Sequence, residues 1–151
     1  MIRKILPFII ILMFTSCGYT PIYNKLDKTN YKINIIEING ERFVNNLISS
    51  EIKRISNSES DIIFNLKIDN DYKKIILSKN IKGTVSDYQL ILKSNFIIEK
   101  DGNIETISFT EKQNIKNTSD IFEQKNYENT IQRNFVISLI RKLNLELLSK
   151  Q

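Results

Sequence analysis

The residue in this chain whose surroundings most clearly imply chemistry is Cys17, its single cysteine. It follows a short basic start, an apolar run at 5–14 and the small residues Thr15 and Ser16. This order is typical of a secretory signal. A thiol released at a new N-terminus can take a diacylglycerol through a thioether bond. The sequence therefore predicts a signal peptide at 1–16 and lipid attachment at Cys17.

The apolar run is too short for a permanent transmembrane helix, which needs roughly 20 residues. Acyl chains on Cys17 would supply the anchor instead, at about 0.8 kcal/mol per buried methylene. Gly18 follows the cysteine where an aspartate would favour retention at the inner membrane. We expect a protein held by lipid on the periplasmic side of the outer membrane. The open alternative is an ordinary cleaved signal followed by a chance cysteine.

The chain lacks the residues on which most catalytic sites depend. It contains no histidine, which removes histidine triads, histidine metal sites and the usual general base. Four glycines leave no glycine-rich phosphate loop. The remaining candidates for a carboxylate-pair hydrolase are Asp61, Asp69, Asp71 and Glu99. Asp69 and Asp71 could also ligate a cation, but a solvated turn explains them better. We predict no enzyme, no metal and no cofactor.

Charge sets a further limit on partners. The formal net charge of +5 falls to +3 when the two basic residues of the signal peptide are removed. A weakly basic surface suits an anionic ligand, but nucleic acid is implausible for an exported lipoprotein. The remaining sequence predicts a tether at 17–30 and one domain at 31–151.

Four segments of that domain alternate apolar and polar residues, as half-buried strands do. They lie at 31–38, 61–77, 85–100 and 104–115. The polar residues 69–71 interrupt the second segment, where we expect a β-bulge. Asp101 and Gly102 predict a type I′ hairpin turn between the last two segments.

Two segments instead place apolar residues at three- and four-residue spacing, which predicts amphipathic helices at 41–55 and 126–148. Residues 117–120 provide a turn with capping side chains. The order β-α-β-β-β-α predicts an α+β two-layer sandwich: a four-stranded, mostly antiparallel sheet with both helices on one face. The first helix should form a right-handed crossover between the first two strands.

Three stretches resemble the LPS-assembly lipoprotein family LptE. The first is 17–23 (Cys-Gly-Tyr-Thr-Pro-Ile-Tyr), similar to the start of the family's mature chain. The second is 83–90 (Gly-Thr-Val-Ser-Asp-Tyr-Gln-Leu), which is similar to a strand opening with an acidic residue before Tyr-x-Leu. The third is 139–143 (Leu-Ile-Arg-Lys-Leu), which is similar to the Leu-Ile-x-x-Leu ending of the family's final helix. Their order behind Cys17 carries the resemblance.

The resemblance implies a sandwich of two helices on a four-stranded sheet and a non-enzymatic role. The family's lipoprotein plugs and helps to assemble the large outer-membrane β-barrel that inserts LPS (LptD-like), and it contacts LPS. There is one departure. Thr84 stands where some family members carry a basic residue, and the nearest basic residues here are Lys79 and Lys82.

Two candidate surfaces follow. A cationic tip could meet lipid A phosphates, and its residues are Lys73, Lys74, Lys79 and Lys82. The face opposite the helices carries Ile91, Lys93 and Ile97 as a candidate partner surface. The open alternatives are a solvated hairpin for the lysines and ordinary exposed apolar residues for the isoleucines.

These surfaces support two hypotheses about function. The first is a barrel partner in LPS export. The second is a free-standing lipoprotein that binds an anionic lipid or glycan without a barrel. A lipid-anchored hydrolase is a third possibility, but the predicted strands bring no pair of carboxylates together.

Overall fold

The computed structural model describes residues 29–150, so the predicted signal peptide and Cys17 lie outside the described residues. Within 29–150 the order of elements is β-α-β-β-β-α, as predicted. The elements are β1 (Lys32–Asn39), α2 (Arg42–Ile55), β2 (Ile63–Lys79), β3 (Val85–Lys100), β4 (Asn103–Lys116) and α3 (Ile121–Leu148). None of the helices in this range combines the length and the apolar character that a bilayer crossing requires.

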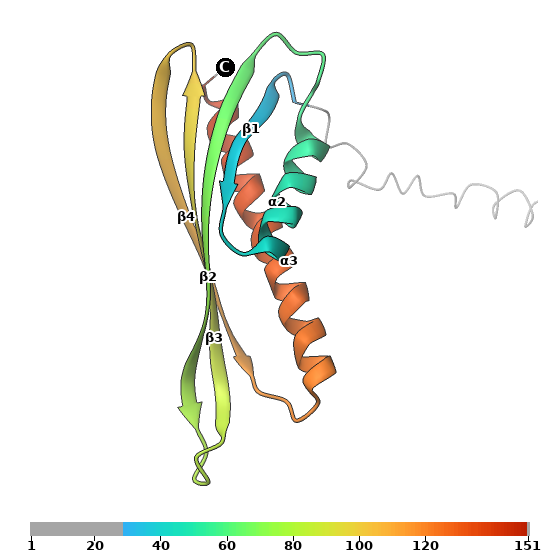
Figure 1. Ribbon diagram of the computed structural model, residues 1–151, viewed down its shortest axis with the longest axis vertical. Helices are drawn as coiled ribbons and strands as arrows, with labels where there is room; N and C mark the ends of the chain where they lie inside the picture. The colour runs from blue at the N-terminus through green and yellow to red at the C-terminus, as the bar shows by residue number, and fades with distance from the viewer. Residues whose placement is uncertain (1–28, 151) are drawn as a thin grey trace, which may run out of the picture.

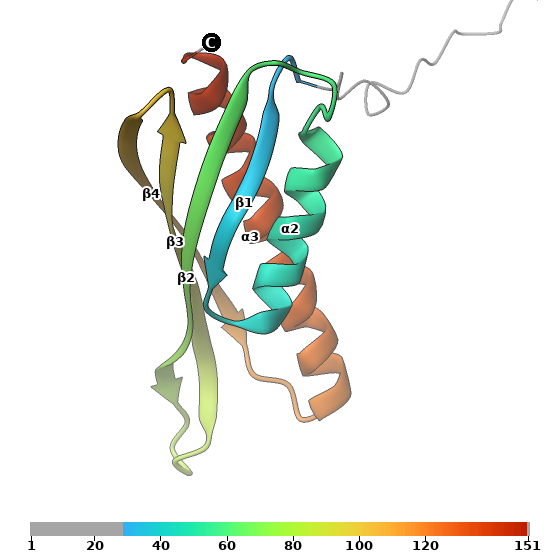
Figure 2. The ribbon, with the colours of Figure 1, turned by 45° about the horizontal axis from the view of Figure 1, so that its top comes forward.

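The strands form one sheet in the order β1-β2-β3-β4. β1 pairs with β2 in parallel, and the other two pairs are antiparallel. Both helices cover the same face of the sheet (Figures 1 and 2). The predicted two-layer α+β sandwich is therefore confirmed, with α2 as the connection between the two parallel strands.

The core lies between that face and the two helices because the strands alternate as the sequence indicates. β2 and β3 point seven apolar side chains inward, α2 contributes four and α3 seven. They are Phe64, Leu66, Ile68, Leu90, Leu92, Phe96 and Ile98 from the strands, Val44, Ile48, Ile52 and Ile55 from α2, and Ile131, Phe135, Val136, Leu139, Ile140, Leu143 and Leu147 from α3. Each large apolar side chain buried in this way contributes about 1.5–3 kcal/mol.

The predicted bulge at 69–71 is wrong, because β2 runs through this segment in unbroken register with β3. Asn70 lies in the buried layer, directly opposite Ser94 on β3. The Ser94 hydroxyl donates to Asn70 Oδ1 at 2.6 Å, and Asn70 Nδ2 donates to Asn45 Oδ1 on α2 at 2.8 Å. Satisfied hydrogen bonds allow a polar pair to occupy the core without a break in the strand. The register of β2 shifts instead next to Ser78.

The turn between β1 and α2 packs tightly against this polar pair. Gly40 has a φ of +115°, and a Cβ at this position would lie 2.1 Å from the carbonyl oxygen of Asn70. Only glycine combines that conformation with that approach. The turn therefore fixes the start of α2 against the middle of β2.

Apolar periodicity predicted the start of α3 incorrectly. α3 begins at Ile121, and the predicted start at 126 is wrong. Asp120 caps the helix by accepting hydrogen bonds from the backbone N–H groups of Phe122 and Glu123 at 2.8 and 3.0 Å. Ile121 and Phe122 are largely exposed, so the first turn shows no buried stripe. The predicted capping turn at 117–120 is confirmed.

Candidate functional site

The β2–β3 hairpin extends past both helices at one end of the molecule (Figure 1). Its turn is held by Asn80, whose side-chain oxygen accepts from the backbone N–H groups of Lys82 and Thr84 at 2.9 and 3.0 Å. Gly83 supplies the positive φ of +80° that closes the loop. Lys79 and Lys82 are both exposed on this turn, and within residues 29–150 no ion pair includes either. The tip therefore presents two available ammonium groups.

The other two predicted lysines lie further down the hairpin and point to opposite faces of the sheet. Lys73 lies on the open face, where its Nζ pairs with Asp71 at 2.6 Å. Lys74 lies on the helix face, where its Nζ meets Glu128 of α3 at 2.5 Å and sits 4.0 Å from the centre of the Tyr88 ring. The four lysines thus form two groups. Lys73 and Lys74 are ion-paired, whereas Lys79 and Lys82 at the turn have no ion pair within residues 29–150.

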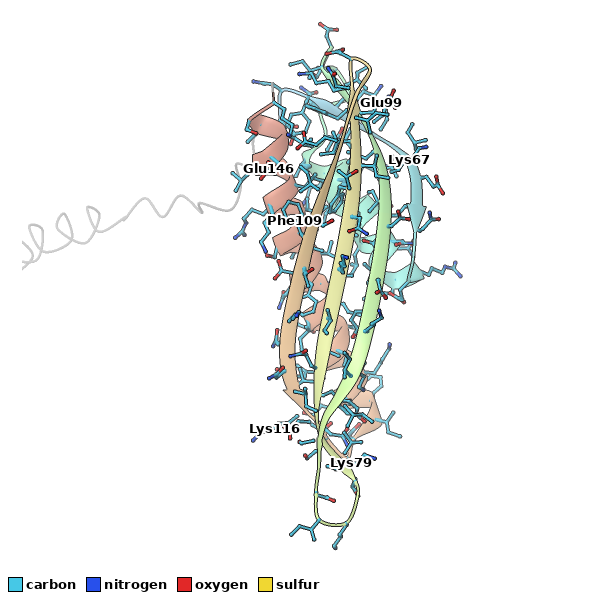
Figure 3. The ribbon with its side chains drawn as sticks, turned by 90° about the vertical axis from the view of Figure 1, so that its left-hand side faces the viewer. Lys67, Lys79, Glu99, Phe109, Lys116 and Glu146 are labelled. Atoms are coloured by element: carbon cyan, nitrogen blue, oxygen red, sulfur yellow. The ribbon has the colours of Figure 1, made fainter. Side chains whose placement is uncertain are left out.

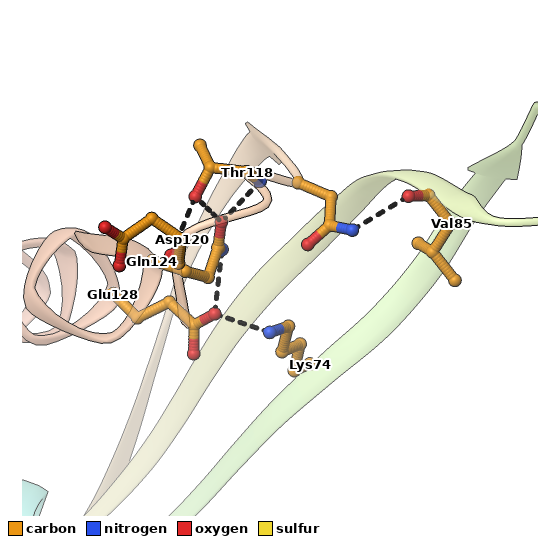
Figure 4. A network of polar contacts seen from close by, with 7 residues as sticks. Lys74, Val85, Thr118, Asp120, Gln124 and Glu128 are labelled. Atoms are coloured by element: carbon orange, nitrogen blue, oxygen red, sulfur yellow. Dashed lines mark hydrogen bonds and ion pairs between the residues drawn. The ribbon is translucent and has the colours of Figure 1, made fainter. Parts of the chain in front are cut away.

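Glu128 belongs to a polar network that joins the hairpin to α3 (Figure 4). Gln124 Nε2 donates to the same Glu128 oxygen at 2.9 Å, and Gln124 Oε1 accepts from the Thr118 backbone N–H at 3.0 Å. In the adjoining loop, Asn117 Nδ2 donates to the carbonyl of Val85 at 2.9 Å. Both Gln124 and Glu128 are buried. The sequence gives no signal that Gln124 and Glu128 are buried, because they point inward from a stretch that has no apolar stripe.

A carboxylate lies on β3, close to the turn of this hairpin. Asp87 accepts hydrogen bonds from the hydroxyls of Ser78 and Ser86. These two donors, and then the nearby charge of Lys116, lower the pKa of Asp87 below its ordinary value. The base of the tip therefore keeps a negative charge at any physiological pH.

Apolar side chains surround these charges. Ile75, Ile76 and Leu77 are each about half exposed, and Ile81 in the turn is fully exposed. Together with Lys79 and Lys82 they form what we call the hairpin tip. Such a surface combines ammonium groups with uncovered apolar area, which is the complement of an amphiphile with an anionic head.

The second candidate surface is the open face of the sheet, opposite the helices (Figure 3). Ile91, Lys93 and Ile97 lie on this face, with the two isoleucines half-buried and the lysine exposed. Ile97 borders a shallow hollow of about 360 Å³ with Ile36 and Ile104. These last two side chains are 58% and 71% exposed. No local sequence pattern marks Ile36 and Ile104 as neighbours, because Ile36 belongs to β1 and Ile104 to β4.

Apolar area therefore concentrates at one end of the open face. Lys67 and Glu99 flank the same hollow, so charged side chains border its apolar floor. An apolar floor with a polar border is the usual anatomy of a protein interface.

Two of the carboxylates considered for catalysis, Asp69 and Asp71, have polar partners close by. Asp69 accepts a hydrogen bond from Asn39 Nδ2 at 3.0 Å, and Asp71 is paired with Lys73. In the part of the chain that the structure describes, no three potential metal ligands come together. These groups therefore have local structural partners.

The fold is similar to those of known proteins, although the sequence is not. No protein-family model matches the sequence, and no curated protein matches it. The fold is similar to the crystal structure of rare lipoprotein B from Shewanella oneidensis, with a TM-score of 0.59 and 10% identity. That match covers 80% of this chain and 99% of the other.

A minor lipoprotein from Acinetobacter baumannii is also similar, with a TM-score of 0.56 and 13% identity over 78% of this chain and 93% of that one. A lipoprotein from Caulobacter crescentus matches with a TM-score of 0.52 and 9% identity over 79% and 92%. At such low identities the likeness is one of fold. The chain therefore has, over most of its length, the fold of rare lipoprotein B and of similar bacterial lipoproteins.

Proposed function

We propose that this chain is an outer-membrane lipoprotein of the LPS-assembly family, anchored through Cys17 on the periplasmic side, which assembles with and plugs the β-barrel that inserts LPS. The observation that carries the proposal is the fold shared with rare lipoprotein B over 99% of that protein. The lipid-attachment sequence at Cys17 supports it independently.

In this role the open face would contact the inner wall of an LptD-like barrel. Ile91, Lys93 and Ile97 are the proposed contacts, and the hollow beside Ile36 and Ile104 adds apolar area to them. The face carries both apolar and charged side chains, which suits a protein interface. No reaction is part of this role.

The hairpin tip is the proposed LPS contact. Lys79 and Lys82 can meet lipid A phosphates directly, because no carboxylate within residues 29–150 holds them. Lys73 and Lys74 remain proposed contacts, but each would first have to leave Asp71 or Glu128. We therefore expect the tip pair to dominate binding.

The direct test of the barrel partner is affinity purification of the full chain, tagged at its C-terminus, from gently solubilised membranes. We expect one large heat-modifiable barrel to co-elute in near-equal amount. Recovery of the lipoprotein alone, from membranes in which the barrel is intact, would refute the proposed assembly. A Cys17→Ala variant, followed by metabolic labelling with palmitate, tests the anchor separately.

The alternative of a free-standing binding lipoprotein is favoured by the exposed, amphiphilic hairpin tip. It predicts that the detergent-extracted chain binds purified LPS as a monomer. A Lys79→Glu/Lys82→Glu variant should then lose binding at least tenfold, whereas Lys32→Glu/Lys53→Glu on β1 and α2 makes the same charge change away from the tip. Equal binding by both variants would exclude the tip as the contact.

A further inference from the structure

A third surface lies at the edge of the sheet that neither candidate site uses. A groove of about 570 Å³ runs between β1 and the C-terminal half of α2, which we call the β1–α2 groove. Its residues from β1 are 32–35, and those from α2 and the following loop are Ser49, Ile52, Lys53, Arg54, Ser56 and Ser58. The groove is separate from the hairpin tip and from the open-face hollow, with which it shares no residue.

The wall formed by β1 is a strand edge. β1 pairs with β2 on one side, and no described strand pairs with its other side. Backbone groups alternate in direction along a strand with parallel pairing. The N–H of Lys32 donates toward β2, to the Ile62 carbonyl at 2.8 Å, and the N–H of Ile33 points the other way, into the groove. The same alternation turns the N–H of Ile35 into the groove, just before the register of β1 against β2 shifts between Ile35 and Glu37.

The start of this edge is already capped, and the rest is open. The Ile33 N–H donates to the Ser56 hydroxyl at 2.9 Å. For Ile35, no loop or side chain among residues 29–150 takes its backbone donor or acceptor. Sheet edges left unpaired in this way are templates for an additional strand.

The chemistry of the groove specifies the kind of strand that fits. Its floor is apolar, with Ile33 and Ile52 nearly buried and Ile35 half-buried. Among the described residues that line it, three are cationic and none is acidic. Arg54 is already held by Glu51, with Nε to Oε2 at 3.0 Å. Lys32 and Lys53 have no ion pair within the described residues.

We propose that the β1–α2 groove accepts an extended acidic peptide segment from another protein, which adds as a fifth strand beside β1. Its backbone would pair with Ile35, its apolar side chains would cover the half-buried Ile35 side chain, and its carboxylates would reach Lys32 and Lys53. This mode of recognition combines main-chain hydrogen bonds for affinity with side-chain pockets for specificity. The proposal goes beyond the proposed function and does not depend on LPS or on the barrel.

The test uses the full chain in detergent and a fluorescein-labelled eight-residue peptide of alternating valine and glutamate, with anisotropy as the readout. We expect saturable binding that weakens at least tenfold in Lys32→Glu/Lys53→Glu. The matched control Lys112→Glu/Lys116→Glu makes the same charge change at the opposite edge of the sheet and should bind as the native chain does. A peptide with lysine in place of glutamate should not bind.

The backbone contact is tested separately. Ile35→Pro removes the outward N–H at an edge position where proline is tolerated, and it should weaken binding at least tenfold. A peptide methylated at its backbone nitrogens probes the same hydrogen bonds without altering the protein, so the test stands even if that variant unfolds.

Three outcomes would overturn the proposal. They are no binding of the glutamate peptide, equal binding of the lysine peptide, and insensitivity to both backbone changes. Vesicles with phosphatidylglycerol serve as a competing ligand. If they bind in a manner that depends on Lys32 and Lys53 while the peptide does not bind, the groove is a headgroup site and the strand proposal is wrong.

Discussion

The two ends of the β2–β3 hairpin belong to the same strands but are stabilised in different ways. Where both helices cover the sheet, β2 and β3 alternate fully buried apolar side chains such as Leu66 and Leu92. Past Tyr72 the apolar alternation of β2 gives way to the Lys74–Glu128 ion pair, the hydroxyls around Asp87 and half-exposed isoleucines. Burial thus stabilises one end, while polar contacts position the other. This difference shows how a small domain can present an apolar, cationic tip without a core beneath it.

The largest expected effect tests the buried end. Leu66→Ala should lower the free energy of unfolding by about 2–5 kcal/mol, because it removes a fully buried side chain and leaves a cavity. Ile76→Ala in the hairpin, where the side chain is half exposed, should cost less than about 1 kcal/mol. Urea unfolding followed by circular dichroism measures both. Similar losses for the two variants would contradict the contrast between the ends.

A smaller effect is expected at the polar pair in the core. Asn70→Ala should cost about 1–3 kcal/mol, because it leaves the Ser94 hydroxyl buried without its acceptor. The variant Asn70→Ala/Ser94→Ala removes both partners and should recover part of that loss. The same unfolding experiment distinguishes the two cases, and a double variant that is less stable than the single one would argue against the hydrogen bond as the cause.

The ion pair at the base of the hairpin should contribute less again. Lys74→Met keeps the side-chain stem over Tyr88 but leaves Glu128 without its cation, at a cost of about 1 kcal/mol. Its neighbour Lys73→Met breaks only an exposed pair and should change stability by less than about 0.5 kcal/mol. Hydrogen exchange should report faster opening of the hairpin amides in Lys74→Met alone. Equal exchange in both variants would refute an anchoring role for Glu128.

The last expected effect concerns two tyrosines, and most of it appears at alkaline pH. Burial raises the pKa of Tyr31 to about 12, and burial followed by the charge of Glu128 raises the pKa of Tyr72 to about 12. An unfolded tyrosine titrates near 10, so both groups stabilise the fold below pH 10 and lose that contribution as the pH rises from about 10 to 12.

Tyr31→Phe and Tyr72→Phe should each flatten the alkaline part of the stability profile. At pH 7, Tyr31→Phe should also cost about 1 kcal/mol, because its hydroxyl donates to Asn144, whereas the Tyr72 hydroxyl has no hydrogen-bond partner among residues 29–150. Stability measured from pH 7 to 12 gives both quantities. A profile that stays steep in the double variant would assign the alkaline loss to other groups.

The same contrast explains how much the sequence could predict. At the buried end, alternation and helical spacing identified the strands, the hairpin turn and both helices, because there a side chain's position determines whether it is buried. Asp101 and Gly102 both adopt positive φ, as the turn prediction requires. Asn70 was misread because its partner Ser94 lies 24 residues away along the chain. A polar residue looks like an interruption until its partner is known.

The candidate sites were harder to predict for a related reason. Lys73 and Lys74 are neighbours in sequence, but the pleat of β2 sends them to opposite faces. The hollow beside Ile97 and the β1–α2 groove each combine residues from elements distant in sequence. No local sequence pattern predicts that these residues lie together. Their proximity follows only from the way in which the strands pair.

The parallel pairing of β1 has a consequence for the order of folding. Lys32 pairs with Ile63, a separation of 31 residues, whereas β3 meets β4 across the turn between Lys100 and Asn103. Closing the longer loop costs more chain entropy before any contact forms. We therefore expect the three-stranded meander of β2, β3 and β4 to form first and β1 to dock last. β1 would then be the last strand to join the sheet. In the folded domain it would also be the strand that separates from the sheet most readily.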